Sequence, residues 1–302
     1  MSEKSFIVHI PATTANLGPG FDCLGLALDL WNTVTFSLID APSLIAIERE
    51  GKGILPEDET NLIFQSASQL ANAHGKLLPE KLHISCRNNI PVASGLGSSA
   101  GAVISGLVGA KIILQLDISD HEILQTAAQI EGHVDNAAAC LLGGLVLVRS
   151  ENDALHFAHR EIQPITAVVA IPEYSLSTKA AREVLPDKVL LENAVFNISH
   201  TVELVHVFQE GNYESLKETM RDKLHQVYRL PLLPGAENAM QAALNMGAYG
   251  SSLSGAGPSV IAFTTQKLAR AVGDAMQSAY QQTSISARIL TLGCPVKGCF
   301  IT

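Results

Sequence analysis

A run of glycine, serine and alanine residues in the first third of the chain has the composition of a phosphate-binding loop. An apolar segment follows directly and reads as a long helix. Glycines let the backbone approach a ligand closely, and amide groups at a helix N-terminus carry partial positive charge. The run therefore predicts a polyphosphate site, formed by Pro91, Val92, Ala93, Ser94, Gly95, Leu96, Gly97, Ser98, Ser99, Ala100 and Gly101.

Two other kinds of nucleotide-binding loop compete with this interpretation. A Walker A loop has a lysine directly after its last glycine, and this run has none. Gly95, Gly97 and Ala100 match the dinucleotide pattern G-x-G-x-x-G/A, but Pro91 separates them from the preceding strand, and the next acidic residues lie between two predicted helices. Dinucleotide binding is the less favoured alternative. An ordinary helix start rich in serine and glycine is the third.

Two further segments combine glycines with residues that could contact a ligand. Residues 11–25 read PATTANLGPGFDCLG, and residues 252–259 read SLSGAGPS. The second segment is compatible with a simple tight turn between two strands. Its paired glycines also permit close backbone approach, so residues 255–259 could support the phosphate site and the junction between domains.

Together the three segments resemble the signature motifs of the GHMP kinase superfamily, over a stretch from Phe6 to about Gly293. The resemblance implies an α+β fold of two domains, the first like ribosomal protein S5 domain 2 and the second ferredoxin-like, with the active site between them. It also implies an ATP-dependent kinase and a homodimer. The form of residues 11–25 implies that the acceptor is the side-chain hydroxyl of L-homoserine, in threonine biosynthesis.

The resemblance assigns the neutralisation of phosphate charge to a magnesium ion, since the phosphate loop brings no lysine. Mg²⁺ prefers hard oxygen ligands and keeps several waters, so one carboxylate and one hydroxyl from the protein suffice. The ligands that the resemblance implies are Ser98 and Glu131. Taken alone, Glu131 would more often be a solvated carboxylate at a helix end.

Residues 131–138 read EGHVDNAA and are similar to a further motif of the superfamily. Asp135 occupies the position from which mevalonate kinase relatives remove the hydroxyl proton, and Asn136 is suited to orient that hydroxyl. Two interpretations stay open: Asp135 is the base, or the reaction proceeds without a true base and depends on positioning and Mg²⁺. His133 is expected to be structural.

An amino-acid substrate carries an ammonium and a carboxylate, so its site needs a fixed anion and a fork-shaped cation. The resemblance assigns Asn16 and Asp22 to the substrate, with Asp22 suited to the ammonium. It places Thr178, Arg182 and Arg229 near the carboxylate, and Arg182 is a catalytic candidate as well. As isolated residues, both arginines would more often be surface ion-pair partners. In the assigned roles they would make the bound substrate bridge the two halves of the chain.

Two other functions have to be considered. The first is the same chemistry on another alcohol such as mevalonate, but an acceptor without an ammonium has no use for Asp22. The second is a catalytically silent nucleotide-binding module, since a fold does not guarantee a function. The presence of Ser98, Glu131 and every loop glycine argues against that.

Composition excludes several classes of partner. The net charge is −9, from 20 basic and 29 acidic residues without a basic cluster, so nucleic acid is not expected. The uncharged stretch between Arg87 and Lys111 is too rich in glycine, serine and proline to span a membrane. The first residues lack the apolar stretch of a signal peptide, and the five cysteines form no C-x-x-C pair. We therefore expect reduced thiols and a cytoplasmic location.

With 302 residues, of which 47% are apolar, the chain is long for one core, and we expect two domains, 1–162 and 163–302. Their mixed order of elements indicates an α+β fold. Hydrophobic periodicity predicts helices over Asn61–His74, Ser98–Leu116, Ser119–Ile130, Leu190–Gln209, Tyr213–His225, Glu237–Met246 and Leu268–Tyr280. It predicts strands over Phe6–Ile10, Leu24–Ile39 (one strand or two, divided around Asp29–Asn32), Ser43–Glu48, Lys81–Cys86, Leu145–Arg149, Ile165–Ile171, Ala248–Leu253, Ser259–Thr264 and Ser286–Leu292.

Overall fold

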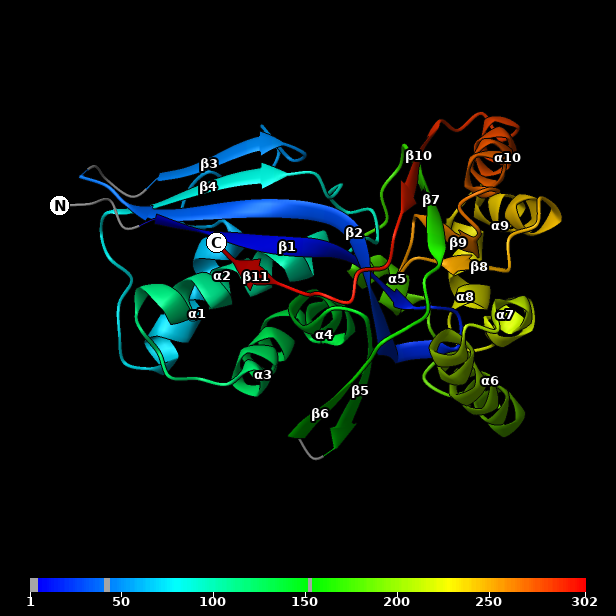
Figure 1. Cartoon of the computed structure of the whole chain (residues 1–302), viewed down its shortest axis with the longest axis horizontal. Coiled ribbons are helices and arrows are strands. Elements are labelled where there is room, and N and C mark those ends of the chain that lie inside the picture. The colour runs from blue at the N-terminus through cyan, green and yellow to red at the C-terminus, as the bar shows by residue number, and fades with distance from the viewer. Residues whose placement is uncertain (1–4, 41–43, 152–153) are drawn as a thin grey trace.

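The structure, a computed structural model, describes residues 5–40, 44–151 and 154–302. It contains two β-sheets, each covered by helices, and the chain passes from the first to the second near its middle (Figure 1). This is the mixed α+β architecture that the order of elements predicts. The predicted strand 43–48 begins at Ser43, outside the described residues, and the structure has a strand over Leu44–Arg49 there.

The first sheet has the order β11-β1-β2-β4-β3, and a hairpin of β5 and β6 extends it along β2. All pairs are antiparallel except β3 with β4. The hairpin strand β6 and the short β11 were not predicted. The strands are β1 (Ser5–Asn16), β2 (Gly20–Leu38), β3 (Leu44–Arg49), β4 (Leu82–Asn88), β5 (Leu145–Glu151), β6 (Ala154–Arg160) and β11 (Phe300–Ile301).

The β1–β2 hairpin corrects one prediction and settles another that was left open. The first strand does not end at Ile10, because β1 continues to Asn16; together with β2, which begins at Gly20, it takes up most of the expected loop 11–25. Between Leu24 and Leu38 there is one strand and not two, although a register shift lies near the expected break: Pro11 pairs with Trp31, whereas its neighbour Ala12 pairs with Leu28. This bulge bends β2 without ending it.

Four helices carry the phosphate loop and the residues that follow it: α1 (Leu62–Ala73), α2 (Ser98–Ile113), α3 (Asp120–Glu131) and α4 (Asp135–Leu142). The first three confirm predicted helices, with ends that differ by up to three residues. Asn61 caps α1 by accepting the amide of Ile63, and Ser119 caps α3 by accepting that of Glu122. The helix α4 was not predicted. It begins at Asp135 and so fixes that candidate catalytic residue at a helix N-terminus.

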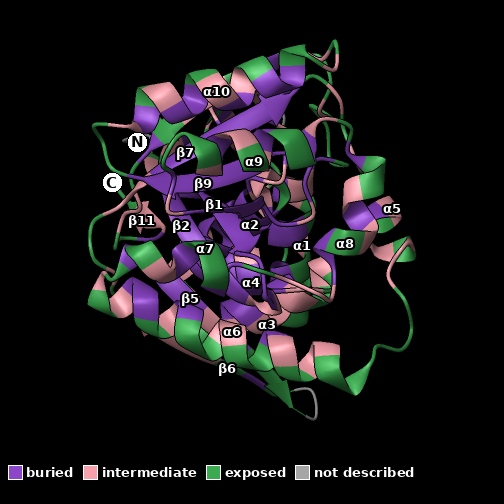
Figure 2. Ribbon diagram, turned by 90° about the vertical axis from the view of Figure 1, so that its right-hand side faces the viewer, coloured by how far each residue is buried: buried purple, intermediate pink, exposed green. Residues whose placement is uncertain are grey.

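The second sheet has the order β10-β7-β9-β8, with strands β7 (Thr166–Pro172), β8 (Gly250–Leu253), β9 (Val260–Thr264) and β10 (Ala287–Leu292). Helices α9 (Ala236–Asn245) and α10 (Ala269–Gln281) cover one face, and α6 (Leu191–Glu210) lies on the opposite side (Figure 2). The core under α6 also contains Leu24 and Leu26 of β2 and Leu96 of the phosphate loop. The two sheets therefore share buried apolar contacts.

The predicted helix Tyr213–His225 is wrong. The structure has a short 3₁₀ turn over Tyr213–Ser215 and two separate short helices, α7 (Leu216–Thr219) and α8 (Gln226–Arg229). The carboxylate of Asp222 accepts the amides of Leu224, His225 and Gln226 at 2.9, 3.0 and 2.7 Å, so it caps α8 instead of continuing one helix.

Another short helix that was not predicted, α5 (Thr178–Glu183), carries two of the candidate substrate residues. At the chain end, β11 pairs with β1, so the last residues lie in the first sheet. The division into domains 1–162 and 163–302 stays a prediction. No helix among the residues that the structure describes is long and apolar enough to cross a membrane.

Candidate active site

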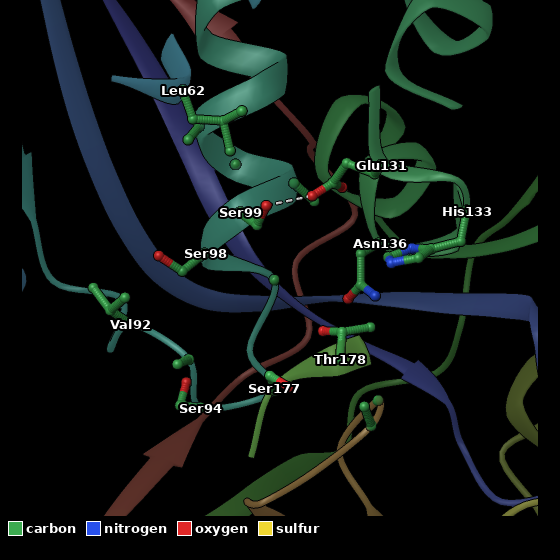
Figure 3. A pocket seen from close by; sticks show the side chains of 18 of the residues that line it. Leu62, Val92, Ser94, Ser98, Ser99, Glu131, His133, Asn136, Ser177 and Thr178 are labelled. Carbon is green, nitrogen blue, oxygen red and sulfur yellow. Dashed lines mark hydrogen bonds between the residues drawn. The ribbon is translucent and has the colours of Figure 1, made fainter. Parts of the chain in front are cut away.

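A cavity of about 1010 Å³ lies where the glycine-bearing segments meet. Its wall includes every candidate metal, catalytic and substrate residue, brought together from β1, β2, α2, α3, α4, α5 and α8. Figure 3 shows part of this wall, with Ser98, Ser99 and Glu131 on one side and Thr178 on the other. Of the eleven predicted phosphate-loop residues, only Pro91 and Leu96 do not line the cavity.

The phosphate loop has the backbone shape that its glycines predict. Gly95 and Gly97 have φ values of 81° and 71°, and Gly97 is the N-cap residue of α2, so no side chain from the cap occupies the amides of the first turn. A Cβ at Gly95 would lie 2.4 Å from the carbonyl oxygen of Ser254, and one at Gly97 would lie 1.9 Å from Oγ1 of Thr13. Both positions need glycine because neighbouring segments press against them.

The three glycine-bearing segments are joined by hydrogen bonds. The Ser254 hydroxyl donates to the carbonyl oxygen of Gly95 at 2.7 Å. The amide of Ser259 donates to the carbonyl oxygen of Ser94 at 3.3 Å. The amide of Thr13 donates to the carbonyl of Leu96 at 3.1 Å. The segments 11–25 and 252–259 thus hold the phosphate loop in place from both sides.

Glu131 has the environment of a carboxylate that lacks a cation. The Ser99 hydroxyl donates to its Oε1, as the dashed line in Figure 3 shows, whereas Oε2 is buried and has no hydrogen-bond partner among the described residues. Burial raises the pKa of Glu131. The Ser98 side chain points away from Glu131 (Figure 3). The structure therefore pairs Glu131 with Ser99, and the joint metal role of Ser98 and Glu131 stays a prediction.

Asp135 and Asn136 form a fixed unit at the start of α4. Asp135 is 3% exposed, and its Oδ1 accepts the amide of Asn136 at 2.7 Å and lies 3.4 Å from Nδ1 of His133. The hydrogen bond to Asp135 raises the pKa of His133. Asn136 Oδ1 in turn accepts the hydroxyl of Thr13 at 2.9 Å, which fixes the orientation of the amide. Thr13 belongs to the segment 11–25, but its sequence gave no signal of this contact.

Asp22 and Arg182 form a two-pronged ion pair, with nitrogen–oxygen distances of 2.8 and 3.0 Å. Asn16 holds the turn beneath them, since its Oδ1 accepts the amide of Asp22 at 3.0 Å and its Nδ2 donates to the carbonyl of Gly255 at 2.9 Å. Asn16 and Asp22 have φ values of 67° and 56°, a costly conformation for residues other than glycine. The structure thus places both predicted substrate residues of this turn at the cavity.

Arg229 is a buried cation, only 1% exposed. Its Nε donates to the carbonyl of Ala181 at 3.0 Å, and one terminal nitrogen lies 3.1 Å from Nδ1 of His225. Within the described part of the chain no acidic side chain forms a salt bridge with it. Burial and, next, the charge of Arg182 lower the pKa of Arg229 to about 10. Such a cation favours a site for an anion.

The ring of Phe21 lies under both arginines, with the guanidinium carbons of Arg182 and Arg229 at 5.6 and 5.2 Å from its centroid. The Phe21 ring also stacks on the ring of His225, with 5.2 Å between the two centroids. Sequence reasoning missed both aromatic residues. The only signals were the position of Phe21 beside Asp22 and the spacing of four residues between His225 and Arg229.

The far end of the cavity is apolar and also escaped prediction. The side chains that form it come from β2, β3, β4, the segment before α1, α1 itself and the phosphate loop, and buried asparagines, Asn32 and Asn61 among them, interrupt them. Such a wall fits a flat apolar ring with polar edges. The lining residues here include Val34, Ile47, Leu55, Leu62, Val92, Asn32 and Asn61.

Comparison with known proteins identifies the family of this chain. The GHMP kinase N-terminal domain model matches residues 61–144, and the GHMP kinase C-terminal model matches residues 204–282. The homoserine kinase of Desulfitobacterium hafniense is 41% identical over 292 residues, which are 96% of this chain and 98% of that protein. The homoserine kinase of Moorella thermoacetica is 41% identical, over 95% and 96%.

Solved structures agree. The crystal structure of homoserine kinase from Cytophaga hutchinsonii superposes with a TM-score of 0.89 at 30% identity, covering 100% of this chain and 98% of that one. Leishmania major mevalonate kinase, at 15% identity and a TM-score of 0.70 over 99% of both chains, shares the fold. The chain is a two-domain GHMP kinase, a class whose co-substrate is ATP. Within that class it belongs to the homoserine kinase family.

Proposed function

We propose that the protein transfers the γ-phosphoryl group of ATP to the side-chain hydroxyl of L-homoserine, forming O-phospho-L-homoserine for threonine biosynthesis. The observation that carries this proposal is the placement of one carboxylate, Asp22, beside two guanidinium groups, Arg182 and Arg229, at the end of a cavity that begins at a phosphate loop. A zwitterionic amino acid complements that set of charges.

The nucleotide has a complementary site at the other end of the cavity. The uncapped amides of α2 and the close backbone at Gly95 suit the triphosphate, and the apolar wall with Asn32 and Asn61 suits adenine. This assignment puts the γ-phosphate near the start of α2. The acceptor hydroxyl then lies between the phosphate loop and Asn136.

Magnesium fits the Glu131 oxygen that has no hydrogen-bond partner among the described residues. Glu131 would hold it through Oε2, with a serine hydroxyl of the first turn of α2 as a second oxygen ligand. Both Ser98 and Ser99 lie in that turn, and Ser99 already contacts Glu131. When bound, the ion supplies the charge neutralisation that phosphoryl transfer needs.

The contacts of Asp135 support positioning rather than proton removal. Its Oδ1 accepts the amide of Asn136 and faces the imidazole of His133, so these contacts hold the side chain in place. Asn136, oriented by Thr13, directs the acceptor hydroxyl. Arg182 lines the same cavity, so it would add positive charge near the transferred group. If Asp135→Asn abolished turnover while it folded and bound both ligands normally, Asp135 would be the base.

A parallel assay with L-homoserine, mevalonate and shikimate tests the acceptor. ADP formation should be fastest with homoserine. Equal or faster turnover of an acceptor that lacks an ammonium would overturn the assignment in favour of the kinase of another alcohol. Nucleotide binding without any turnover across amino-acid acceptors would instead favour a silent binding module. The homodimer and the cytoplasmic location stay predictions.

A further inference from the structure

His225 is fully buried and contacts Arg229 of the cavity wall without lining the cavity itself, and it has no part in the mechanism above. Its ring lies between two structural features. Nε2 is 2.8 Å from the carbonyl oxygen of Gly18 in the turn between β1 and β2, and Nδ1 is 3.1 Å from a terminal nitrogen of Arg229. The imidazole therefore connects the turn that carries Asp22 with the helix that carries Arg229.

The two contacts fix the protonation state of the ring. A guanidinium group has donors and no acceptor, so Nδ1 must accept and carry no proton. A carbonyl oxygen can only accept, so Nε2 must carry the proton and donate it to Gly18. The neutral ring with hydrogen on Nε2 is the one form that satisfies both partners. Burial and the charge of Arg229 also act against protonation, and they lower the pKa of His225.

The surroundings hold this ring rigidly. Phe21 stacks on it, at 5.2 Å between centroids. The nearby carboxylate of Asp222 does not compete for the Nε2 proton, since it lies 3.7 Å away and accepts the amides of His225 and Gln226. Asn197 of α6 donates to Asp222 at 2.7 Å and to the carbonyl of Pro19 at 3.0 Å. The ring is thus held by the same turn that it contacts.

We propose that neutral His225 is a positioning residue that aims the guanidinium of Arg229 at the substrate carboxylate and sets its distance from Asp22. The inference rests on the proposed function, in which Arg229 receives that carboxylate. Arg229 has no acidic partner among the described residues to orient it, so the imidazole acceptor and the carbonyl of Ala181 fix its plane. Without the imidazole the guanidinium would keep its charge and lose its direction.

Two substitutions separate the contacts of the ring. An asparagine amide reaches the place of Nδ1 and can still accept from Arg229, whereas a glutamine amide reaches the place of Nε2 and can still donate to Gly18. We expect His225→Gln to raise the KM for L-homoserine by roughly 10-fold, because a hydrogen bond to a charged group is lost, with the KM for ATP unchanged. His225→Asn should raise it far less.

The L-homoserine carboxamide makes the test specific. This acceptor has no carboxylate for Arg229, so His225→Gln should not weaken it further relative to the wild-type protein. Equal losses with homoserine and its carboxamide, a parallel rise in the KM for ATP, or an unchanged KM for homoserine would each overturn the inference. Wild-type protein that does not phosphorylate homoserine would overturn the proposed function itself.

A measurement on the unsubstituted protein covers the case in which the variants do not fold. In ¹⁵N-histidine NMR spectra, His225 should show an unprotonated Nδ1 and a protonated Nε2. The Nδ1 resonance should shift when homoserine is added and stay in place when an ATP analogue is added alone. A proton on Nδ1, or an Nδ1 chemical shift that does not change when homoserine is added, would contradict the positioning role.

Discussion

The two ends of the cavity are built in different ways. At the phosphate end, the proposed recognition depends on backbone amides and on the space that glycines leave open, within one continuous run of residues. At the acceptor end it depends on charged side chains from the β1–β2 turn, α5 and α8, held by hydrogen bonds among themselves. A triphosphate is recognised mainly by close approach of the backbone, whereas a small zwitterion needs fixed charges on opposite sides.

The difference has an energetic reason. Backbone amides at a helix start are neutral, so they need no counter-charge before the ligand arrives. Asp22 and Arg182 neutralise each other, while Arg229 is hydrogen-bonded to neutral acceptors and forms no salt bridge with any described residue. The acceptor end is therefore more sensitive to the loss of one charge, and the phosphate end to the addition of one methyl group.

The largest effect is expected from Arg229→Met. It removes the buried charge and should raise the KM for homoserine by about 100-fold, since charge-assisted hydrogen bonds are the strong ones. The KM for ATP should stay close to the wild-type value. Arg270→Met, at an arginine whose side chain is 94% exposed, is the matched control and should change neither constant. Equal losses for both substrates would remove the distinction between the two ends.

Gly95→Ala tests the phosphate end. The new Cβ would lie 2.4 and 2.7 Å from two carbonyl oxygens of the segment 252–259. We therefore expect the KM for ATP to rise. The free energy of unfolding should fall by about 2 kcal/mol in addition to the cost of placing alanine at a positive φ. Gly75→Ala is the control for that strain, because Gly75 also has a positive φ of 64° and nothing within 4 Å of its Cβ position. Equal stability losses in denaturant titrations of the two variants would rule out the steric explanation.

Glu131→Gln tests the cation at the boundary between the two ends. Burial raises the folded-state pKa of Glu131, so its stability contribution is full below the unfolded pKa, near 4.5, and is lost as the pH rises through the folded pKa. Without metal at pH 8, the glutamine variant should therefore melt about 2 °C higher than the wild type, and the gap should close toward pH 4.

Excess Mg²⁺ with an ATP analogue should reverse that order by stabilising the wild type more than the variant. Turnover of the variant should fall at every Mg²⁺ concentration. If calorimetry found the metal-free variant less stable than the metal-free wild type at pH 8, burial of the Glu131 carboxylate would not be destabilising, and this explanation would be wrong.

The smallest effect is a pair of opposite pH dependences. The pKa of folded-state His225 is lowered, so its contribution to the free energy of unfolding is full above the unfolded pKa, near 6.5, and is lost on acidification. The pKa of folded-state His133 is raised, so its contribution is full below 6.5 and is lost as the pH rises through the folded pKa. In denaturant titrations, His225→Asn should cost more stability at pH 8 than at pH 5. His133→Asn should cost more at pH 5 than at pH 8, and parallel trends would argue against these environments.

Much of the phosphate end follows from local sequence. The glycine-rich loop and the start of α2 at Ser98 can be recognised from neighbours in the chain, and the structure confirms both. The roles of Asp22, Arg182 and Arg229 came from resemblance to a family. Their individual substrate contacts stay predictions, although the structure brings all three to one cavity.

The sequence by itself therefore determined the α+β class, most helices and the phosphate loop, because these depend on periodicity and on contacts between near neighbours. Only the tertiary structure decided that Thr13 orients Asn136 and that Asp222 interrupts a predicted helix. It also decided that His225 contacts a carbonyl 207 residues away. Such contacts form when separate segments pack together, and no local pattern of residue types encodes which distant partner a buried polar group will meet.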